Sequence, residues 1–312
     1  ATAKGATILP SRFVLKIKVK QDTEVGSPTY GRHIFDKAKS RLVAGGHRSV
    51  EGRDHFETAA YTSKAQSMRM LFALATSRDW DVTSNDISQA FLYSELEEGR
   101  EIFMELPELL SEGGVRDSSA YDSRCGAGKG SGKVGKLNKY LYGLPEASRA
   151  FSRNMRLFFK GLNSKHGSGL DRSVSRALIS DRMTFRWTCW INGKKEEALI
   201  CTHVDDIVIA SSGPEIRAEF ERQLRKFFGE DRITGGEEVD YVLGMRVERD
   251  RAKKTLKLSQ GAFVRQLLEK FEIEENSKVV DTPLPTGTAL EKYEGTADVE
   301  ARSKYLTLVG CL

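Results

Sequence analysis

Two adjacent aspartates, Asp205 and Asp206, stand between two apolar runs that are rich in β-branched residues. The run before them reads ALICTHV and the run after them reads IVIASS, so the segment predicts a β-hairpin with both carboxylates at its tip. Like charges at a strand junction repel each other, and a purely structural hairpin gains nothing from them. An ordinary Asp-Asp turn is the alternative for this segment by itself, because Asp side chains bond to nearby backbone in turns.

A third carboxylate, Asp86, lies near the end of an earlier candidate strand, residues 80–87. In an antiparallel sheet this strand can run beside the hairpin and bring Asp86 to its tip. Mg²⁺ prefers carboxylate oxygen, and two such ions roughly 3.5–4 Å apart can activate a hydroxyl and stabilise a leaving pyrophosphate. Asp86, Asp205 and Asp206 are therefore the predicted catalytic and metal-binding residues, with two Mg²⁺ or Mn²⁺ ions as cofactors.

The positive charge of the chain is concentrated at its N-terminal end. Residues 1–50 hold ten Lys/Arg and three Asp/Glu, so they carry 10 − 3 = +7, whereas the whole chain carries +5. A basic lobe on a near-neutral body favours a polyanionic partner, and nucleic acid is the first to consider. A solvated basic surface would give the same pattern.

Strands and helices are predicted to interleave between residues 80 and 258, which indicates an α+β fold. The predicted strands share alternating or β-branched apolar residues: 13–20, 40–44, 80–87, 183–191, 198–204, 207–211, 241–249 and 255–258. The predicted helices are rich in good helix formers: 64–78, 145–162, 214–228 and 260–271, with 88–94 as a helix or turn. The first two strands flank a turn-rich stretch at residues 26–31 and should form a basic hairpin.

The predicted helix 145–162 carries a basic stripe. Arg149, Arg153, Arg156 and Lys160 follow one another at spacings of 4, 3 and 4, so they share one face of the helix. A separate apolar stripe suits packing against the rest of the protein. The basic face can hold a phosphate backbone, or it can be an ordinary solvated surface.

The segment 111–133 is dense in Gly and Ser, and its AGKGSGK resembles a phosphate-binding loop. The Walker template needs Gly at position 127 and Ser or Thr at position 134, and this chain has Ala127 and Val134. A flexible insertion is therefore predicted.

Cellular location can also be inferred from the sequence. No apolar run approaches the roughly 20 residues that cross a bilayer. The four cysteines, Cys125, Cys189, Cys201 and Cys311, have neither disulfide-framework nor zinc-site spacing. These features predict an intracellular protein in a reducing compartment, with no membrane partner.

Segments in order along nearly the whole chain resemble motifs of copia-type (Pseudoviridae-like) LTR-retrotransposon reverse transcriptases. Two of them carry the carboxylates: DISQAF, which begins at Asp86, and HVDDI, which begins at His203. The others are KSRLVAGG, GRDHFET, KLNKYLYGLPEASRAF, YVLGMRVERD, LKLSQGAFVRQLLEKFEI, VVDTPL and SKYLTLVG. One such motif is weak evidence, but their shared order is specific.

The resemblance implies an RNA-directed DNA polymerase, part of a Pol polyprotein, that transfers nucleotides onto a primer 3′-hydroxyl. It implies a right-hand polymerase with a ferredoxin-like antiparallel palm sheet. The fingers would span 1–79 and 103–147, the palm 80–102 and 148–250, and the thumb base with the start of the connection 251–312. Because the end, YLTLVGCL, is apolar, we expect a truncated chain.

The same resemblance implies the partners and the location. Deoxynucleoside triphosphates and an RNA or DNA template with its primer would bind, and the family's ribonuclease H and integrase parts lie elsewhere in the polyprotein. The protein would act in the cytoplasm or within virus-like particles.

The resemblance also implies roles for residues of the nucleotide site. Phe91 would stack beneath the sugar and exclude a 2′-hydroxyl, unless it is an ordinary core aromatic. Lys39 and Arg41 would contact the triphosphate, and Lys16 or Lys18 could substitute for them. Glu146 occupies a position that helps to seat the nucleotide or template.

Further residues would hold primer and template: Arg149, Arg153, Arg156, His203, Leu243, Gly244 and Met245. Arg149 coincides with an arginine of the family. The segment around Gly244 would position the primer end by close backbone approach, which Gly permits.

The sequence departs from the family pattern near the expected site. His203 stands where the family has Tyr, and Glu146 stands where it has Gln. A carboxylate at 146 would repel phosphates unless it is protonated or paired. Tyr61 replaces a Pro and Ser94 replaces a Gly. These differences leave a second hypothesis open, namely a catalytically inactive, nucleic-acid-binding remnant.

Overall fold

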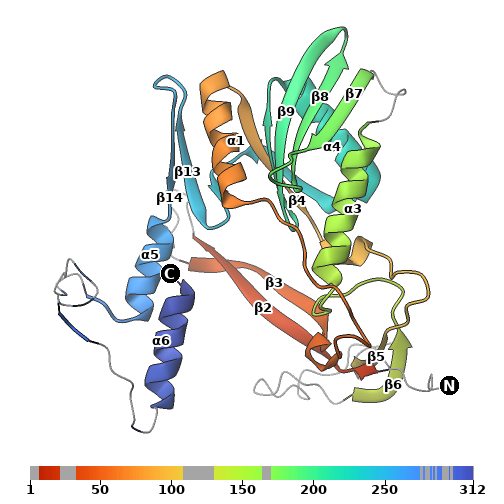
Figure 1. Cartoon of the computed structure of the whole chain (residues 1–312), viewed down its shortest axis with the longest axis vertical. Helices are drawn as coiled ribbons and strands as arrows, with labels where there is room; N and C mark the ends of the chain where they lie inside the picture. The colour runs from red at the N-terminus through yellow and green to blue at the C-terminus, as the bar shows by residue number, and fades with distance from the viewer. Residues whose placement is uncertain are drawn as a thin grey trace. The chain divides into compact units, whose positions relative to one another are not determined.

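The computed structural model describes residues 7–21, 33–107, 130–163, 170–274 and 298–311, with a few positions between 275 and 297. The chain divides into two compact units (Figure 1). The first comprises Ala1–Val239 with Arg251–Thr255, and the second comprises Asp240–Asp250 with Leu256–Leu312. All three aspartates belong to the first unit.

A six-stranded sheet forms the centre of the first unit, in the order β11-β4-β10-β9-β8-β7 (Figure 1). Every neighbouring pair in this sheet is antiparallel. Its strands are β4 (Asp81–Ile87), β7 (Leu170–Ala177), β8 (Thr184–Ile191), β9 (Lys194–His203), β10 (Asp206–Ser211) and β11 (Ile233–Glu238). The two apolar runs around the paired aspartates thus lie at the middle of the sheet, as β9 and β10.

Helices cover both faces of this sheet because its central strands are apolar on both sides. Ile200, Ile207 and Ile209 belong to a buried cluster that also contains Phe151 of α3 (Ala147–Gly161) and Phe220 of α4 (Pro214–Phe228). Leu199, Cys201 and Val208 point to the other face, and they are buried too. The helix α1 (Ala65–Arg78) contacts β4, β9 and β10 on that side. The sheet is therefore held rigidly between helices.

The basic N-terminal lobe is a long antiparallel hairpin of β2 (Ser11–Gln21) and β3 (His33–Ala44). Cross-strand partners share a face of a sheet, so the register separates two kinds of side chain. One face carries cations, namely Lys16, Lys18, Lys37, Lys39 and Arg41. The other face carries exposed apolar side chains, namely Leu15, Ile17, Val19 and Phe35.

A small sheet of β1 (Ile8–Leu9), β5 (Phe103–Pro107) and β6 (Gly130–Lys136) lies beside this hairpin, in the order β1-β5-β6. The hairpin is joined to the loop before α3, because the backbone N–H of Ala44 donates to the carbonyl of Tyr142 at 2.8 Å. Gly143 follows with φ +88°, and a Cβ there would lie 2.1 Å from the Ala44 carbonyl oxygen. Only glycine fits this junction.

The described part of the second unit contains β12 (Tyr241–Val242), β13 (Met245–Asp250), most of β14 (Thr255–Ser259), α5 (Gly261–Lys270) and α6 (Val299–Cys311). The strands form a sheet in the order β12-β13-β14. Leu243 and Gly244, between β12 and β13, have φ values of 46° and 79°. Two successive left-handed residues are typical of a tight hairpin turn.

The short 3₁₀ helices are η1 (Gly46–Arg48), η2 (Ala90–Tyr93) and η4 (Glu230–Arg232). The predicted α+β class is confirmed, and the helix predicted at 214–228 has those bounds. The helix predicted from Pro145 begins instead at Ala147, after Glu146. The single strand predicted at 241–249 is wrong, because the Leu243-Gly244 turn divides it.

The prediction of a flexible insertion through 133 is also wrong at its end, since Gly130–Lys136 is the strand β6. The rest of that insertion, the turn expected near 26–31, Cys125 and most of VVDTPL lie outside the described residues. Within the described parts of the chain, no helix combines the length and apolarity needed to span a membrane.

Candidate active site

Strand register brings the three predicted aspartates together. Asp206 on β10 lies opposite Asp86 on β4, and Asp205 occupies the turn between β9 and β10. One carboxylate oxygen from each of the three lies within 4.8 Å of the others. The predicted convergence of the strand 80–87 with the hairpin tip is confirmed.

The backbone of the turn holds Asp205 in place. Val204 has φ 55°, a left-handed conformation that is costly for a β-branched residue. The carbonyl of Asp205 accepts a hydrogen bond from the N–H of Ile87 at 3.1 Å, which ties the turn to β4. Pairing on both sides of β10 thus fixes a turn that would be unfavourable by itself.

The electrostatics of the cluster favour a bound cation. Burial, and then the charge of Asp205, raise the pKa of Asp86. Burial, followed by Asp205 and Asp86, also raises the pKa of Asp206. Three carboxylates held this close repel one another, and a divalent ion with oxygen ligands would relieve the repulsion. The residues present therefore fit a hard divalent metal.

The basic face of the β2–β3 hairpin supplies positive charge near these carboxylates. Lys39, Lys18 and Lys37 oppose the rise in the Asp86 pKa. Burial, and then the neighbouring cations Lys18, Arg41 and Lys37, lower the pKa of Lys39. An anionic ligand would stabilise the charged form of a lysine that is crowded by other cations, because the ligand offsets the repulsion between the positive charges. This face is a candidate site for a polyphosphate.

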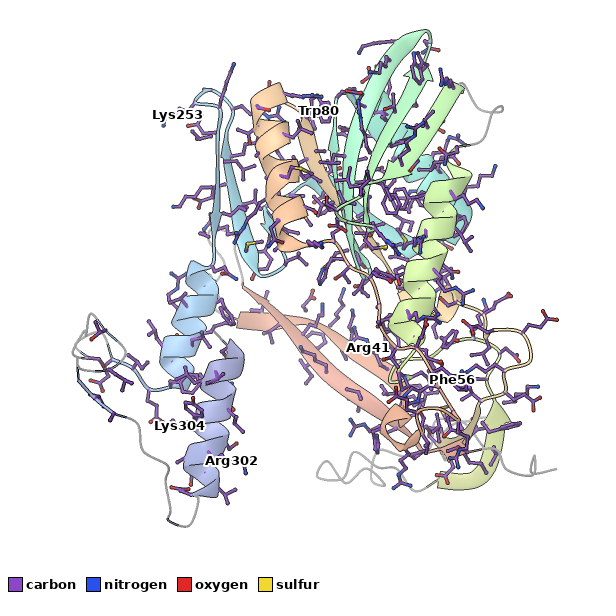
Figure 2. All side chains as sticks on the ribbon, viewed as in Figure 1. Arg41, Phe56, Trp80, Lys253, Arg302 and Lys304 are labelled. Atoms are coloured by element: carbon purple, nitrogen blue, oxygen red, sulfur yellow. The ribbon has the colours of Figure 1, made fainter. Side chains whose placement is uncertain are left out.

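Phe91 lies in η2, five residues after Asp86, and contacts two other rings. Its ring centroid is 5.1 Å from that of Tyr142, with an interplanar angle of 66°, and 6.4 Å from that of Phe151. The guanidinium of Arg41, which projects from β3 (Figure 2), lies 5.4 Å from the centroid of the Tyr142 ring. Tyr142 therefore connects a residue of the hairpin with the aromatic side chain that follows Asp86.

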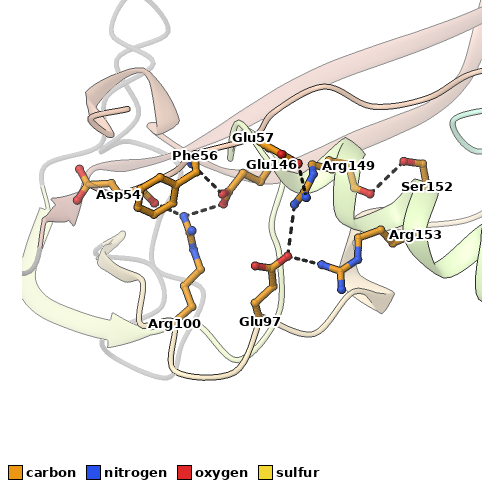
Figure 3. Close-up of polar contacts among 9 residues, drawn as sticks. All are labelled: Asp54, Phe56, Glu57, Glu97, Arg100, Glu146, Arg149, Ser152 and Arg153. Atoms are coloured by element: carbon orange, nitrogen blue, oxygen red, sulfur yellow. Dashed lines mark hydrogen bonds and ion pairs between the residues drawn. The ribbon is translucent and has the colours of Figure 1, made fainter. Parts of the chain in front are cut away.

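The carboxylate of Glu146 is buried and paired. Arg100 lies 2.6 Å from it, and the side chains of Glu146 and Arg100 are 7% and 16% exposed (Figure 3). The backbone N–H of Phe56 donates to Glu146 at 3.4 Å, and Arg100 also donates to the carbonyl of Asp54. The repulsion expected from a carboxylate at this position is thus balanced inside the protein.

The basic stripe of α3 divides into two halves. Arg149 is 2.6 Å from Glu57 and 3.4 Å from Glu97, and Arg153 pairs with Glu97 as well (Figure 3). Among the residues that the structure describes, Arg156 and Lys160 have no ion-pair partner. The half nearest the C-terminus of α3 is therefore the more accessible to an external anion.

The remaining predicted site residues occupy different places. His203 lies opposite Asp206 across β9 and β10, and its buried Nδ1 has no hydrogen-bond partner among the described residues. Leu243, Gly244 and Met245 belong to the second unit. No atom of the described residues lies within 4 Å of a Cβ built on Gly244, so the backbone conformation, and not crowding, accounts for glycine there.

Three features of the site were not predicted from the sequence. Tyr142 contacts Phe91 and Arg41, although it belongs to the KLNKYLYGLPEASRAF segment that was recognised. Arg100 pairs with Glu146, and Glu57 and Glu97 pair with the α3 arginines. A buried carboxylate such as that of Glu146 needs a cationic partner, so an arginine or lysine could have been expected. No local signal identifies Arg100, which lies 46 residues away in the sequence.

Comparison with known proteins adds independent information. The family described as "Reverse transcriptase (RNA-dependent DNA polymerase)" matches residues 29–285. The chain is similar to a retrovirus-related Pol polyprotein from transposon TNT 1-94 of Nicotiana tabacum, with 28% identity over 99% of the chain and 20% of that protein.

Two Pol polyproteins of Arabidopsis thaliana are similar as well. The one from transposon RE1 is 28% identical over 98% of the chain and 18% of its own length. The one from transposon RE2 is 26% identical over 99% of the chain and 18% of its own length. The chain spans about a fifth of the length of these relatives.

Proposed function

The chain belongs to the reverse transcriptase (RNA-dependent DNA polymerase) family, and from this premise we propose that it extends a primer 3′-hydroxyl by nucleotidyl transfer. The observation that carries the proposal is the convergence of Asp86, Asp205 and Asp206 within 4.8 Å, near the cationic face of β2–β3. A carboxylate cluster and a polyphosphate-binding surface are the two parts that such a reaction requires.

The three aspartates would hold two divalent ions, Mg²⁺ or Mn²⁺. Bound there, the ions would supply the positive charge that activates the primer hydroxyl and stabilises the leaving pyrophosphate. The antiparallel register holds Asp86 opposite Asp206, and the strained turn holds Asp205 beside them. The protein thus arranges its ligands before any ion binds.

The incoming deoxynucleoside triphosphate would lie between the aspartates and the β2–β3 hairpin. Lys39 and Arg41 would neutralise its phosphates, because both lie on the face whose charge reaches Asp86. Phe91 would lie beneath the sugar and leave no room for a 2′-hydroxyl. Glu146 would act through its Arg100 pair, by fixing the loop that precedes α3.

Primer and template would contact the stripe of α3 (Arg149, Arg153 and Arg156), His203, and the turn Leu243-Gly244-Met245. Fingers at 1–79 and 103–147, a ferredoxin-like palm at 80–102 and 148–250, and a thumb base at 251–312 would give the right-hand arrangement. The antiparallel central sheet supports the palm assignment.

Ribonuclease H and integrase parts of a Pol polyprotein would complete the machinery in the cytoplasm or in virus-like particles. The names of the similar polyproteins support this context.

A catalytically inactive, nucleic-acid-binding remnant is the second candidate, and the histidine at 203 favours it. Within the part of the chain that the structure describes, the buried Nδ1 of His203, opposite Asp206, has no hydrogen-bond partner, which is unfavourable by itself. Glu146 no longer supports this candidate, since Arg100 balances its charge. Both candidates would bind nucleic acid with the same surface, and they differ only in whether the protein extends the primer.

Primer extension on a poly(rA)/oligo(dT) duplex with Mg²⁺ or Mn²⁺ distinguishes them. We expect metal-dependent extension by the unmodified chain and none by the Asp205→Asn, Asp206→Asn double variant. If the unmodified chain and the His203→Tyr variant both bind the duplex but extend its primer neither with Mg²⁺ nor with Mn²⁺, the remnant is the correct description.

A further inference from the structure

The ring of Tyr142 makes contacts in two directions within the nucleotide site. On one side it packs edge-on against Phe91, with centroids 5.1 Å apart. On another, the guanidinium of Arg41 lies 5.4 Å from its centroid. Aromatic pairs prefer such tilted arrangements, and a guanidinium is attracted to a ring face, so both contacts are favourable.

The backbone fixes the position of this ring. The carbonyl of Tyr142 accepts the 2.8 Å hydrogen bond from Ala44, which ends β3. Gly143 has φ +88°, and its missing side chain allows β3 to approach the loop closely. Because β3 also carries Arg41, this backbone contact holds the segment of Tyr142 beside the strand of Arg41.

Burial raises the pKa of the Tyr142 hydroxyl, and Arg41 opposes that rise while Asp205 and Asp86 add to it. The hydroxyl end of Tyr142 therefore lies within electrostatic reach of the carboxylate cluster.

We propose that Tyr142 is a specificity-determining residue that positions both Phe91 and Arg41, so that selection of the sugar and binding of the triphosphate depend on one side chain. This inference rests on the proposed function. Without the Tyr142 ring, Phe151 is the one ring contact that Phe91 keeps among the described residues, at 6.4 Å. Phe91 can then tilt into the vacated space and admit a 2′-hydroxyl, while Arg41 loses the surface on which it rests.

The test compares dTTP with UTP on a poly(rA)/oligo(dT) duplex. Tyr142→Leu and Tyr142→Gln remove the ring, Tyr142→Phe keeps it, and Tyr93→Leu is the matched control. Tyr93 belongs to the same 3₁₀ turn as Phe91, but its ring packs against Phe228. Melting temperatures establish that each variant is folded.

Two readouts are needed. The first is the kcat/KM ratio of dTTP to UTP in primer extension. The second is the nucleotide concentration that stabilises the protein–duplex complex against a competitor when Ca²⁺ replaces Mg²⁺, which requires no chemistry.

For both variants without the ring, we expect the preference for dTTP over UTP to fall on the order of tenfold. We expect the dTTP concentration that stabilises the protein–duplex complex to rise roughly three- to tenfold. Tyr93→Leu should match the unmodified chain in both quantities. Tyr142→Phe keeps the ring but loses the hydroxyl that bonds with Arg41, so it should keep the preference for dTTP over UTP. Phe91→Ala should change the sugar preference alone, and Arg41→Gln should change the required concentration alone. The combined effect of removing the Tyr142 ring is what a merely structural role would not produce.

Unchanged values of both quantities in a folded Tyr142→Leu or Tyr142→Gln variant would overturn the inference and leave the proposed function intact. If dTTP neither stabilises the complex of the unmodified chain nor extends its primer, the proposed function fails, and the inference fails with it.

Discussion

Asp86 and Asp206 face each other across two neighbouring strands, and burial together with the charge of Asp205 raises the pKa of both carboxyls. A carboxyl whose pKa is higher in the folded than in the unfolded state stabilises the fold at low pH. That contribution is lost as pH rises through the folded pKa. At neutral pH these side chains therefore oppose folding, as expected for residues that serve a ligand.

Asp206→Asn should raise the melting temperature of the metal-free protein by about 2–4 °C, the shift that roughly 1 kcal/mol produces in a domain of this size. The gain should shrink as pH falls below the raised pKa of Asp206, because the carboxyl of the unmodified protein is then protonated too. Thermal melting in EDTA at several pH values measures both effects. A variant that melts lower than the unmodified protein at neutral pH would show that Asp206 is structurally required.

Glu146→Gln should destabilise the protein by about 1–3 kcal/mol, since it leaves the largely buried guanidinium of Arg100 without its carboxylate. Urea denaturation measures the change. The matched control is Glu101→Gln, which removes the exposed pair with Lys136, whose side chains are 50% and 51% exposed. That change should cost little. Equal costs for the two substitutions would contradict the structural role given to Arg100.

At the scale of the element, α3 shows why a stripe of like residues need not act as one surface. Arg149 and Arg153 are held by Glu57 and Glu97, which come from segments far away in the sequence. Arg156 and Lys160, one to two turns further along, have no such partner among the described residues. A phosphate backbone must displace a carboxylate at the first pair and only water at the second.

Replacing Arg156 and Lys160 with Gln should therefore reduce the salt dependence of nucleic-acid binding by about one unit of log–log slope per lost phosphate contact. Replacing Arg149 should reduce it less, and Glu97→Gln should increase affinity because it frees Arg153 and leaves Arg149 paired with Glu57 alone. Fluorescence anisotropy of a labelled primer–template at a series of salt concentrations measures the slopes. The matched control is Arg176→Gln with Lys226→Gln, two exposed cations that belong to β7 and α4 and not to α3.

An unchanged slope in the Arg156, Lys160 variant would mean that this half of α3 is a solvated surface. A larger effect from Arg149 than from that pair would mean that nucleic acid displaces the glutamates readily.

The β2–β3 hairpin shows that the apolar face of an amphipathic element need not be buried. Alternation of apolar and basic residues predicts a half-buried strand, and the register does separate the two kinds of residue. The apolar face, however, is exposed at Leu15, Ile17 and Phe35. The charges of the basic face are the ones that act on the carboxylate cluster. In this hairpin the apolar residues therefore mark the face that does not serve the candidate active site.

At the scale of the whole molecule, the first unit contains the carboxylates, the cationic hairpin and α3, and the second contains the turn at Leu243-Gly244. The proposed metal site therefore lies within one compact unit. Ligand binding to a folded unit stabilises it by an amount that grows with ligand concentration.

Mg²⁺ or Mn²⁺ should accordingly raise the melting temperature of the unmodified chain. At about 10 mM ion and a Kd of about 1 mM, the gain is about 1.4 kcal/mol. The Asp205→Asn, Asp206→Asn variant should show no such shift, and Na⁺ at equal ionic strength controls for screening. A shift of equal size in the variant would place the ion elsewhere on the protein.

Local patterns in the sequence determined much of this protein. The period of apolar residues located β9, β10, α1 and α4, and the paired aspartates located the turn. These features depend on neighbours within a few residues, so they can be read without the fold. The place of Asp86 near the end of the strand 80–87 marked the third carboxylate, and the recognised motifs added the family.

The strands β7 (LDRSVSRA) and β11 (ITGGEE) were not predicted. Most of their residues are polar or glycine, and they form strands because the edges of β8 and β4 offer hydrogen-bonding groups that need partners. Tertiary context overrides weak local preference at such edges.

Only the tertiary structure decided which charges are free and which are paired. The partners of Glu146, Arg149 and Arg153 lie tens of residues away, and so do the contacts of Tyr142 with Arg41 and Phe91. Ion pairs and ring contacts depend on distances of a few ångströms, which the order of residues does not specify. The sequence therefore identified the candidate site residues, and the packing of distant segments determined how they are held.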